Sequence, residues 1–162
     1  MSRLDSFVRR LEAQRACLDH AARLIAGLRG NVLEFGLGNG RTYDHLRSLF
    51  DGRDIYVFDR QVAAHPACIP PADHLFVGDF LETLPRAAAQ LGAHTALANL
   101  DVGSGDEAAS QVLARAMTPL VLRLLQPGAI VVSDQPITDP ALEVMPLPAG
   151  IEPGRYFLRR RR

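Results

Sequence analysis

The 162-residue chain contains no lysine and no tryptophan, and all 18 of its basic side chains are arginine. Without lysine no Schiff base can form on the protein, which excludes pyridoxal enzymes and lysine-dependent aldolases. The phosphate-binding loop G-x-x-x-x-G-K-[ST] is absent for the same reason, so an ordinary P-loop nucleotide hydrolase is excluded as well.

Net charge, aromatic residues and long apolar runs are also scarce. The 18 acidic residues balance the arginines, and seven Phe with three Tyr are the whole aromatic content, which argues against nucleic-acid binding. No run reaches the roughly 18 apolar residues of a membrane span, and the charged N-terminus lacks the apolar core of a signal peptide. Cys17 and Cys68 form no metal motif or disulfide framework. We therefore expect a cytoplasmic protein that binds neither nucleic acid nor membrane.

Hydrophobic periodicity predicts helices alternating with short buried strands. Apolar residues recur at three- and four-residue steps in the N-terminal helical segment 1–29, where Ser2 and Asp5 resemble a capping box. This alternation predicts one α/β domain over residues 1–162, with a parallel sheet covered on both faces. The expected helices are 3–28, 41–50, 81–91 and 107–125; the expected strands are 31–35, 54–59, 74–78, 95–100 and 129–133.

The remaining segments have other patterns. Residues 66–72 hold three prolines and are expected to be irregular. Residues 142–147 and 155–158 flank a stretch too short and too rich in Pro and Gly for a helix, so they are expected to form an antiparallel strand pair. The arginine run 159–162 is interpreted as a solvated or frayed end.

The most informative motif is Glu34-Phe35-Gly36-Leu37-Gly38-Asn39-Gly40, at the junction of the first strand and the next helix. Glycines there let the backbone turn sharply and bring its N–H groups close to a ligand. A dinucleotide fingerprint G-x-G-x-x-G would place its third glycine at position 41, one residue later than it occurs. The G-x-G-x-G form with a preceding acid resembles motif I of class I S-adenosylmethionine-dependent methyltransferases.

Four further elements are similar to this family, in the family's order. Asp59 ends the second strand and Gly78-Asp79-Phe80 ends the third. Asn99-Leu100-Asp101 ends the fourth, and the sequence from 125 to 129 resembles the L-x-P-G-G element before the fifth. The resemblance implies a Rossmann-like, doubly wound seven-stranded sheet in the order 3-2-1-4-5-7-6, with strand seven antiparallel and helices on both faces.

The resemblance also implies S-adenosylmethionine as cofactor and assigns roles to individual residues. Glu34 would meet the methionine amino group, and Thr42 the methionine carboxylate. Asp59 would accept both ribose hydroxyls, and Asp79 the adenine amine. The expected cofactor-binding residues are Glu34, Gly36, Leu37, Gly38, Asn39, Gly40, Thr42, Asp59, Arg60, Gly78, Asp79, Phe80 and Asn99.

The expected activity is methyl transfer to a small-molecule acceptor, with Asp101 as the candidate general base. Asp101 with Asp134-Gln135 partly resembles the metal site of catechol-type O-methyltransferases, but the catalytic lysine of that group is Ser104 here, and no metal is expected. No long insertion is available to close the acceptor site, so a second subunit is expected to complete it in a homodimer. Two alternatives stay open: a dinucleotide-dependent oxidoreductase, and a non-catalytic methyltransferase-like binding module.

Overall fold

One sheet of seven strands organises the structure, a computed structural model that describes residues 2–162. Its strand order is β3-β2-β1-β4-β5-β7-β6, and β7 runs antiparallel to both of its neighbours. The predicted order and direction are confirmed. The strands are β1 (Asn31–Phe35), β2 (Ile55–Asp59), β3 (Leu75–Val77), β4 (Thr95–Leu100), β5 (Leu125–Ser133), β6 (Leu142–Val144) and β7 (Phe157–Arg161).

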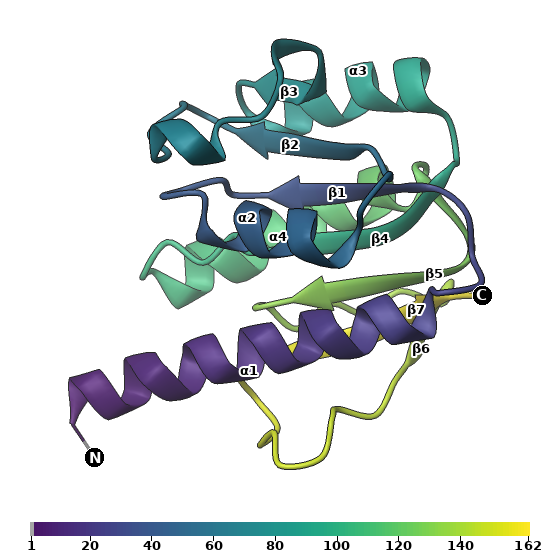
Figure 1. Ribbon diagram of the computed structural model, residues 1–162. Helices are drawn as coiled ribbons and strands as arrows, with labels where there is room; N and C mark the ends of the chain where they lie inside the picture. The colour runs from purple at the N-terminus through teal and green to yellow at the C-terminus, as the bar shows by residue number, and fades with distance from the viewer. Residues whose placement is uncertain (1) are drawn as a thin grey trace.

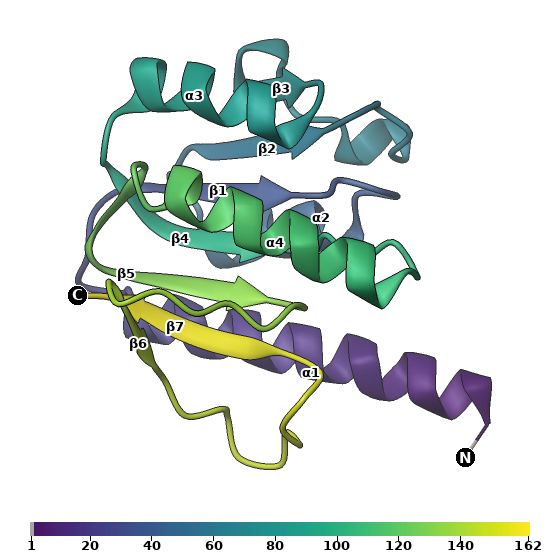
Figure 2. The same cartoon turned by 180° about the vertical axis from the view of Figure 1, so that it is seen from behind.

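Helices cover both faces of the sheet. Figure 1 shows α1 and α2 on the near face, and Figure 2 shows α3 and α4 on the other. Strands β1 and β4 are buried along their whole length, as strands covered on both sides should be. The helices are α1 (Arg3–Leu24), α2 (Arg41–Leu49), α3 (Phe80–Leu91) and α4 (Glu107–Val121), with short 3-10 helices at Pro66–Cys68 and Ala72–His74 in the proline-rich segment.

Helix α1 is long and starts beyond the sheet. Its first turn is fixed by a capping box, in which Ser2 Oγ accepts from the Asp5 amide and the Asp5 carboxylate accepts from the Ser2 amide, each at 3.0 Å. The N-terminal end projects past the carboxyl ends of the parallel strands (Figures 1 and 2). Its middle buries Ala13, Cys17 and Leu18 against the sheet. The N-terminal half of α1 therefore lies beside the edge at which ligands bind in this class of fold.

Two helices end four residues earlier than predicted, and the other helix bounds agree to within one residue. Helix α1 stops at Leu24, not at residue 28, and α4 stops at Val121, not at residue 125. Strand β5 begins at Leu125 because this residue pairs with Thr95 of β4, ahead of the Pro127-Gly128 pair that was expected to precede the strand. Sheet pairing thus takes over a segment whose composition alone is compatible with helix.

The expectation for the arginine run was wrong, because Arg159 and Arg161 belong to β7. Arg159 is only 8% exposed. Its Nε donates to the carbonyl of Ile137 and its Nη1 to that of Leu158, each at 2.9 Å. An arginine stem can cover apolar surface while the guanidinium ends on carbonyl oxygens, which is why this strand tolerates the charge. The antiparallel pair predicted at 142–147 and 155–158 is formed by β6 and β7, which span 142–144 and 157–161.

Candidate active site

In the glycine loop after β1, two of the glycines pack closely against other parts of the chain. All three of its glycines have positive φ. A Cβ on Gly36 would lie 2.3 Å from the carbonyl oxygen of Asp101, and one on Gly40 would lie 2.4 Å from the Cβ of Cys68. At Gly38 a Cβ would meet nothing within 4 Å. The outer glycines are therefore required by packing, and Gly38 is the position that leaves space for a ligand.

Asp59 and the glycine loop are joined directly. Oδ2 of Asp59 accepts from the backbone N–H of Leu37 at 2.8 Å and of Gly38 at 3.1 Å. Within residues 2–162, Oδ1 accepts only from the amide of Gln61, at 3.3 Å. The structure thus brings together the predicted loop and the predicted ribose-binding acid, and leaves Oδ1 as the carboxylate oxygen with most capacity for a further partner.

The segment between β3 and α3 lies at the same carboxyl edge of the sheet as the glycine loop. Asp79 caps α3 by accepting from the amide of Leu81 at 2.8 Å, and its Oδ2 lies 3.6 Å from the exposed guanidinium of Arg60. The ring of Phe80 is buried and packs edge-on against Phe35, with 5.8 Å between centroids. Arg60 and Asp79 are therefore neighbours, while the Phe80 ring belongs to the core.

Glu34 and Asn99 form a buried pair between β1 and β4. They are register partners, and Nδ2 of Asn99 donates to Oε2 of Glu34 at 2.7 Å. Both side chains are 0% exposed. Burial raises the pKa of Glu34 well above its ordinary value; the hydrogen bond from Asn99 opposes this shift, and the charge of Asp101 adds to it. Oε1 of Glu34 and Oδ1 of Asn99 have no hydrogen-bond partner among the described residues.

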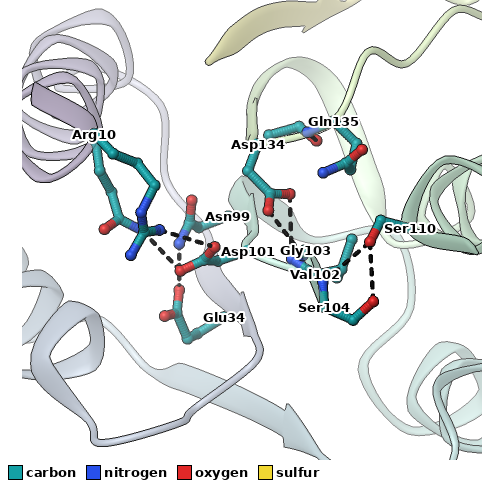
Figure 3. A network of polar contacts seen from close by, with 12 residues as sticks. Arg10, Glu34, Asn99, Asp101, Val102, Gly103, Ser104, Ser110, Asp134 and Gln135 are labelled. Carbon is teal, nitrogen blue, oxygen red and sulfur yellow. Dashed lines mark hydrogen bonds and ion pairs between the residues drawn. The ribbon is translucent and has the colours of Figure 1, made fainter. Parts of the chain in front are cut away.

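Asp101 lies next to this pair and contacts two side chains of α1. Gln14 Nε2 donates to its Oδ2 at 2.9 Å, and the guanidinium of Arg10 lies 3.8 Å from its Oδ1. Figure 3 shows Arg10 directed from α1 toward Asp101, with Glu34 and Asn99 beside it. Sequence reasoning missed both α1 residues. The available signal was Gln14 itself, a polar residue on the helix face that also carries Leu11 and Leu18.

Asp134 supports the neighbouring loop. Its carboxylate accepts from the amides of Val102 at 3.2 Å and Gly103 at 2.8 Å, contacts visible in Figure 3. Burial raises its pKa, and the nearby charge of Asp101 raises it further. Because both oxygens are used by the backbone, Asp134 acts as a loop cap. Within residues 2–162 no group of three or more His, Cys, Asp or Glu side chains could hold a metal ion.

The remaining predicted residues lie around the same loop. Asn39 is exposed, and its carbonyl accepts from the amide of His65 at 3.1 Å. Thr42 is half-buried and lines a cavity of about 180 Å³ between α1 and α2. A larger cavity of about 500 Å³, lined by Arg29, Arg53 and His94 among others, contains none of the predicted site residues. It lies where β1, β2 and β4 begin, at the edge opposite the proposed site.

No helix within residues 2–162 has both the length and the apolar character needed to cross a membrane.

Comparisons with known proteins agree with this geometry. Over 89% of its length the chain superposes, with a TM-score of 0.58 and 15% identity, on 44% of MycE methyltransferase from the mycinamycin biosynthetic pathway. Over 86% it superposes on 59% of DesVI from Streptomyces venezuelae, with a TM-score of 0.55 and 15% identity. These two likenesses show the fold alone. No curated protein matches the chain.

A much nearer likeness is the crystal structure of an S-adenosyl-L-methionine methyl transferase from Silicibacter pomeroyi DSS-3. It is 46% identical, with a TM-score of 0.95, and the match covers 100% of this chain and 99% of that one. A family model described as S-adenosyl-L-methionine methyltransferase matches residues 1–161. These matches decide against the dinucleotide-dependent oxidoreductase. The chain belongs to the S-adenosyl-L-methionine methyltransferase family.

Proposed function

We propose that this enzyme transfers the methyl group of S-adenosylmethionine to a small-molecule acceptor, with Asp101 receiving the acceptor's proton. The observation that carries the proposal is the buried Glu34–Asn99 pair beside Asp101 (Figure 3), in which Glu34 Oε1 and Asn99 Oδ1 have no hydrogen-bond partner within the described residues. These oxygens suit a group with N–H donors, such as the methionine ammonium. The open position at Gly38 and the free capacity of Asp59 Oδ1 suit the nucleoside part.

The cofactor, when bound, supplies an electrophilic methyl carbon that needs no activation by the protein. The chain's own contribution is then alignment, exclusion of water and control of one proton. Gln14 already donates to Oδ2 of Asp101, whereas Oδ1 has no hydrogen bond within residues 2–162 and lies 3.8 Å from the guanidinium of Arg10. Oδ1 is therefore the atom we assign to accept the proton.

The cover provided by α1 supports an acceptor of small size. The side chain of Asp101 is 23% exposed and that of Arg10 40%, so the proposed base is partly enclosed. A broad macromolecular surface would have to displace this helix before it could reach Asp101. We assign the other predicted residues from Gly36 to Asp79 to the cofactor, because they lie on the glycine loop and at the ends of β2 and β3, and for Phe80, whose ring packs on Phe35, we assign its backbone.

The assembly and location are part of the same proposal. Leu4, Phe7 and Val8 on the projecting end of α1 are 69%, 45% and 43% exposed, and they support association of two copies into a homodimer. Sedimentation of the wild-type chain and of Phe7→Glu tests this: a dimer that becomes a monomer supports it, and a wild-type monomer rejects it.

The chain is assigned as one cytoplasmic domain, consistent with two free cysteines.

Two measurements test the catalytic proposal. Calorimetry should show that S-adenosylhomocysteine binds both the wild type and Asp101→Asn, because Asp101 is assigned to the acceptor and not to the cofactor. Methyl transfer from labelled S-adenosylmethionine to a panel of small metabolites should occur with the wild type and be lost in Asp101→Asn. Transfer to no member of the panel, despite tight binding, would favour the non-catalytic binding module.

A further inference from the structure

The cavity of about 180 Å³ between α1 and α2 shares residues with both parts of the candidate active site. It is lined by Thr42, which we assign to the methionine part of the cofactor, and by Gln14, whose amide donates to Asp101 at 2.9 Å. The reactive sulfur of the cofactor belongs to that same methionine part. The cavity therefore borders both of the groups that a methyl acceptor has to reach, the methyl donor and the proposed base.

The lining of this cavity is mostly apolar. Leu11 and Leu18 lie about two turns apart on the same face of α1, and both contribute to the lining. An apolar cavity of about 150 Å³ is large enough to bind benzene. A volume of about 180 Å³ therefore suits an apolar body of roughly the size of one six-membered ring.

The cavity also carries positive charge. Arg15 and Arg41 line it, and within residues 2–162 neither an acidic lining residue nor an ion pair to a carboxylate neutralises their guanidinium groups. The third basic residue of the lining, His45, already contacts Asp19 at 2.8 Å. The two arginines are thus the charges that can bind an anionic group of a ligand.

The contact between Asp19 and His45 shows how these arginines are placed. Helices α1 and α2 both run from the carboxyl edge of the sheet toward the opposite edge (Figure 1), and this contact joins them. Arg15 and Arg41 each come four residues, about one turn, before these partners and lie on the same helix faces. They therefore face each other across the cavity, one turn nearer the carboxyl edge. Two like charges in this arrangement repel, and an anion between them removes the repulsion.

We propose that this cavity binds the methyl acceptor, and that the acceptor is a small apolar acid, with a body about the size of one six-membered ring and a carboxylate at one end. The inference rests on the proposed function. Leu11 and Leu18 contact the apolar body. Arg15 and Arg41 bind the carboxylate, whose two oxygens match the fork of a guanidinium group.

The acceptor atom then lies at the other end of this molecule, past Gln14 and toward Asp101. The bond between the acceptor atom and the methyl carbon forms as the carbon–sulfur bond breaks, and the electron pair of the broken bond stays on sulfur. The acceptor's proton passes to Oδ1 of Asp101. Arg15 and Arg41 take no part in these bond changes and act by placing the acceptor.

Benzoate and benzamide test the proposal, because they share one ring and differ in charge. Titrated into the protein bound to S-adenosylhomocysteine, benzoate should shift the methyl NMR signals of Leu11 and Leu18. It should bind roughly fivefold or more tightly than benzamide, as expected for exposed ion pairs. Arg15→Met should weaken benzoate binding roughly three- to fivefold and leave benzamide binding within about twofold of wild type. Arg9→Met is the matched control: it removes an exposed arginine of the same helix that lines a different cavity, and it should change neither affinity.

Other outcomes separate the possible failures. Benzoate that does not bind, binds no better than benzamide, or shifts signals away from the cavity would overturn the proposal. An equal loss of benzoate affinity in Arg15→Met and Arg9→Met would also overturn it, because net charge and not the cavity would then be responsible. In calorimetry S-adenosylhomocysteine should bind Arg15→Met as tightly as wild type, and a weaker affinity would assign Arg15 to the cofactor instead of the acceptor. A wild-type chain that does not bind S-adenosylhomocysteine would overturn the proposed function itself.

Discussion

Replacing Glu34 by glutamine should stabilise the free protein and weaken its cofactor site at the same time. The carboxyl group is fully buried, and its pKa is raised well above the ordinary value of 4.5. From pH 4.5 up to the raised pKa, the folded chain keeps a proton that the unfolded chain has released. The free energy of unfolding therefore falls as pH rises through this window, by about 1.4 kcal/mol per pH unit. Glutamine has nearly the same shape and no proton to lose, so Glu34→Gln removes this loss.

The measurement is denaturant unfolding of both proteins between pH 5 and about pH 8. The stability advantage of Glu34→Gln should grow with pH and then level off where Glu34 ionises in the folded chain. Glu152→Gln, the same change at an exposed loop position, should give a curve parallel to wild type. Parallel curves for Glu34→Gln as well would refute the reasoning.

The binding half of the prediction has the opposite sign. An ammonium group on the ligand favours the ionised carboxyl, so S-adenosylhomocysteine should bind more tightly as pH rises and should release a proton from the wild type. Calorimetry in buffers of different ionisation enthalpy measures that proton directly. Glu34→Gln should bind more weakly and release none. Proton uptake by the wild type would contradict the assignment.

Three further changes test other parts of the site and fold. Asp59→Ala removes the acceptor for the amides of Leu37 and Gly38 and should weaken S-adenosylhomocysteine binding by about 1–3 kcal/mol in calorimetry; unchanged affinity would remove Asp59 from the site. Gly36→Ala should lower the free energy of unfolding by about 3 kcal/mol, because its Cβ would lie 2.3 Å from a backbone oxygen. Gly38→Ala, where a Cβ meets no neighbour, should lower it by only about 1 kcal/mol. Equal losses in denaturant unfolding would reject the packing argument. Arg159→Met removes the donor to the carbonyl of Ile137, while the carbonyl of Leu158 still accepts from the amide of Met145, and should cost about 1–3 kcal/mol. A variant as stable as wild type would show that the guanidinium contributes nothing.

The parts of the molecule that could be predicted are those with local signals. Strand β1 is an apolar run ending in glycines, and the structure confirms its bounds at Asn31 and Phe35. The glycine spacing and the acids at the strand ends indicated the family before any contact was known. Helix ends were less accurate, because the choice between continuing α4 and starting β5 depends on Leu125 pairing with Thr95, thirty residues away in sequence.

Asp101 was predicted on the acceptor side, but its contacts with α1 could not be, because they are long-range. Gln14 and Asp101 are 87 residues apart, and no motif around either residue indicates that the two are in contact. Arg159 was misread for a related reason: a run of four arginines resembles a solvated end until strand alternation turns one of them inward.

Strand β7 lies between β5 and β6, so local unfolding of β7 must also release β6 and expose β5. Strand β6 pairs only with β7, and β7 also pairs with β5. Detaching β6 therefore exposes three residues at an edge, whereas detaching β7 releases both strands and exposes the end of β5. Amide hydrogen exchange in β7 should then follow the same slow opening that uncovers the acceptor side, with β6 exchanging faster. A ligand bound at the carboxyl ends of β4 and β5 would slow exchange along β7, so exchange rates at this side of the sheet would report occupancy of the site.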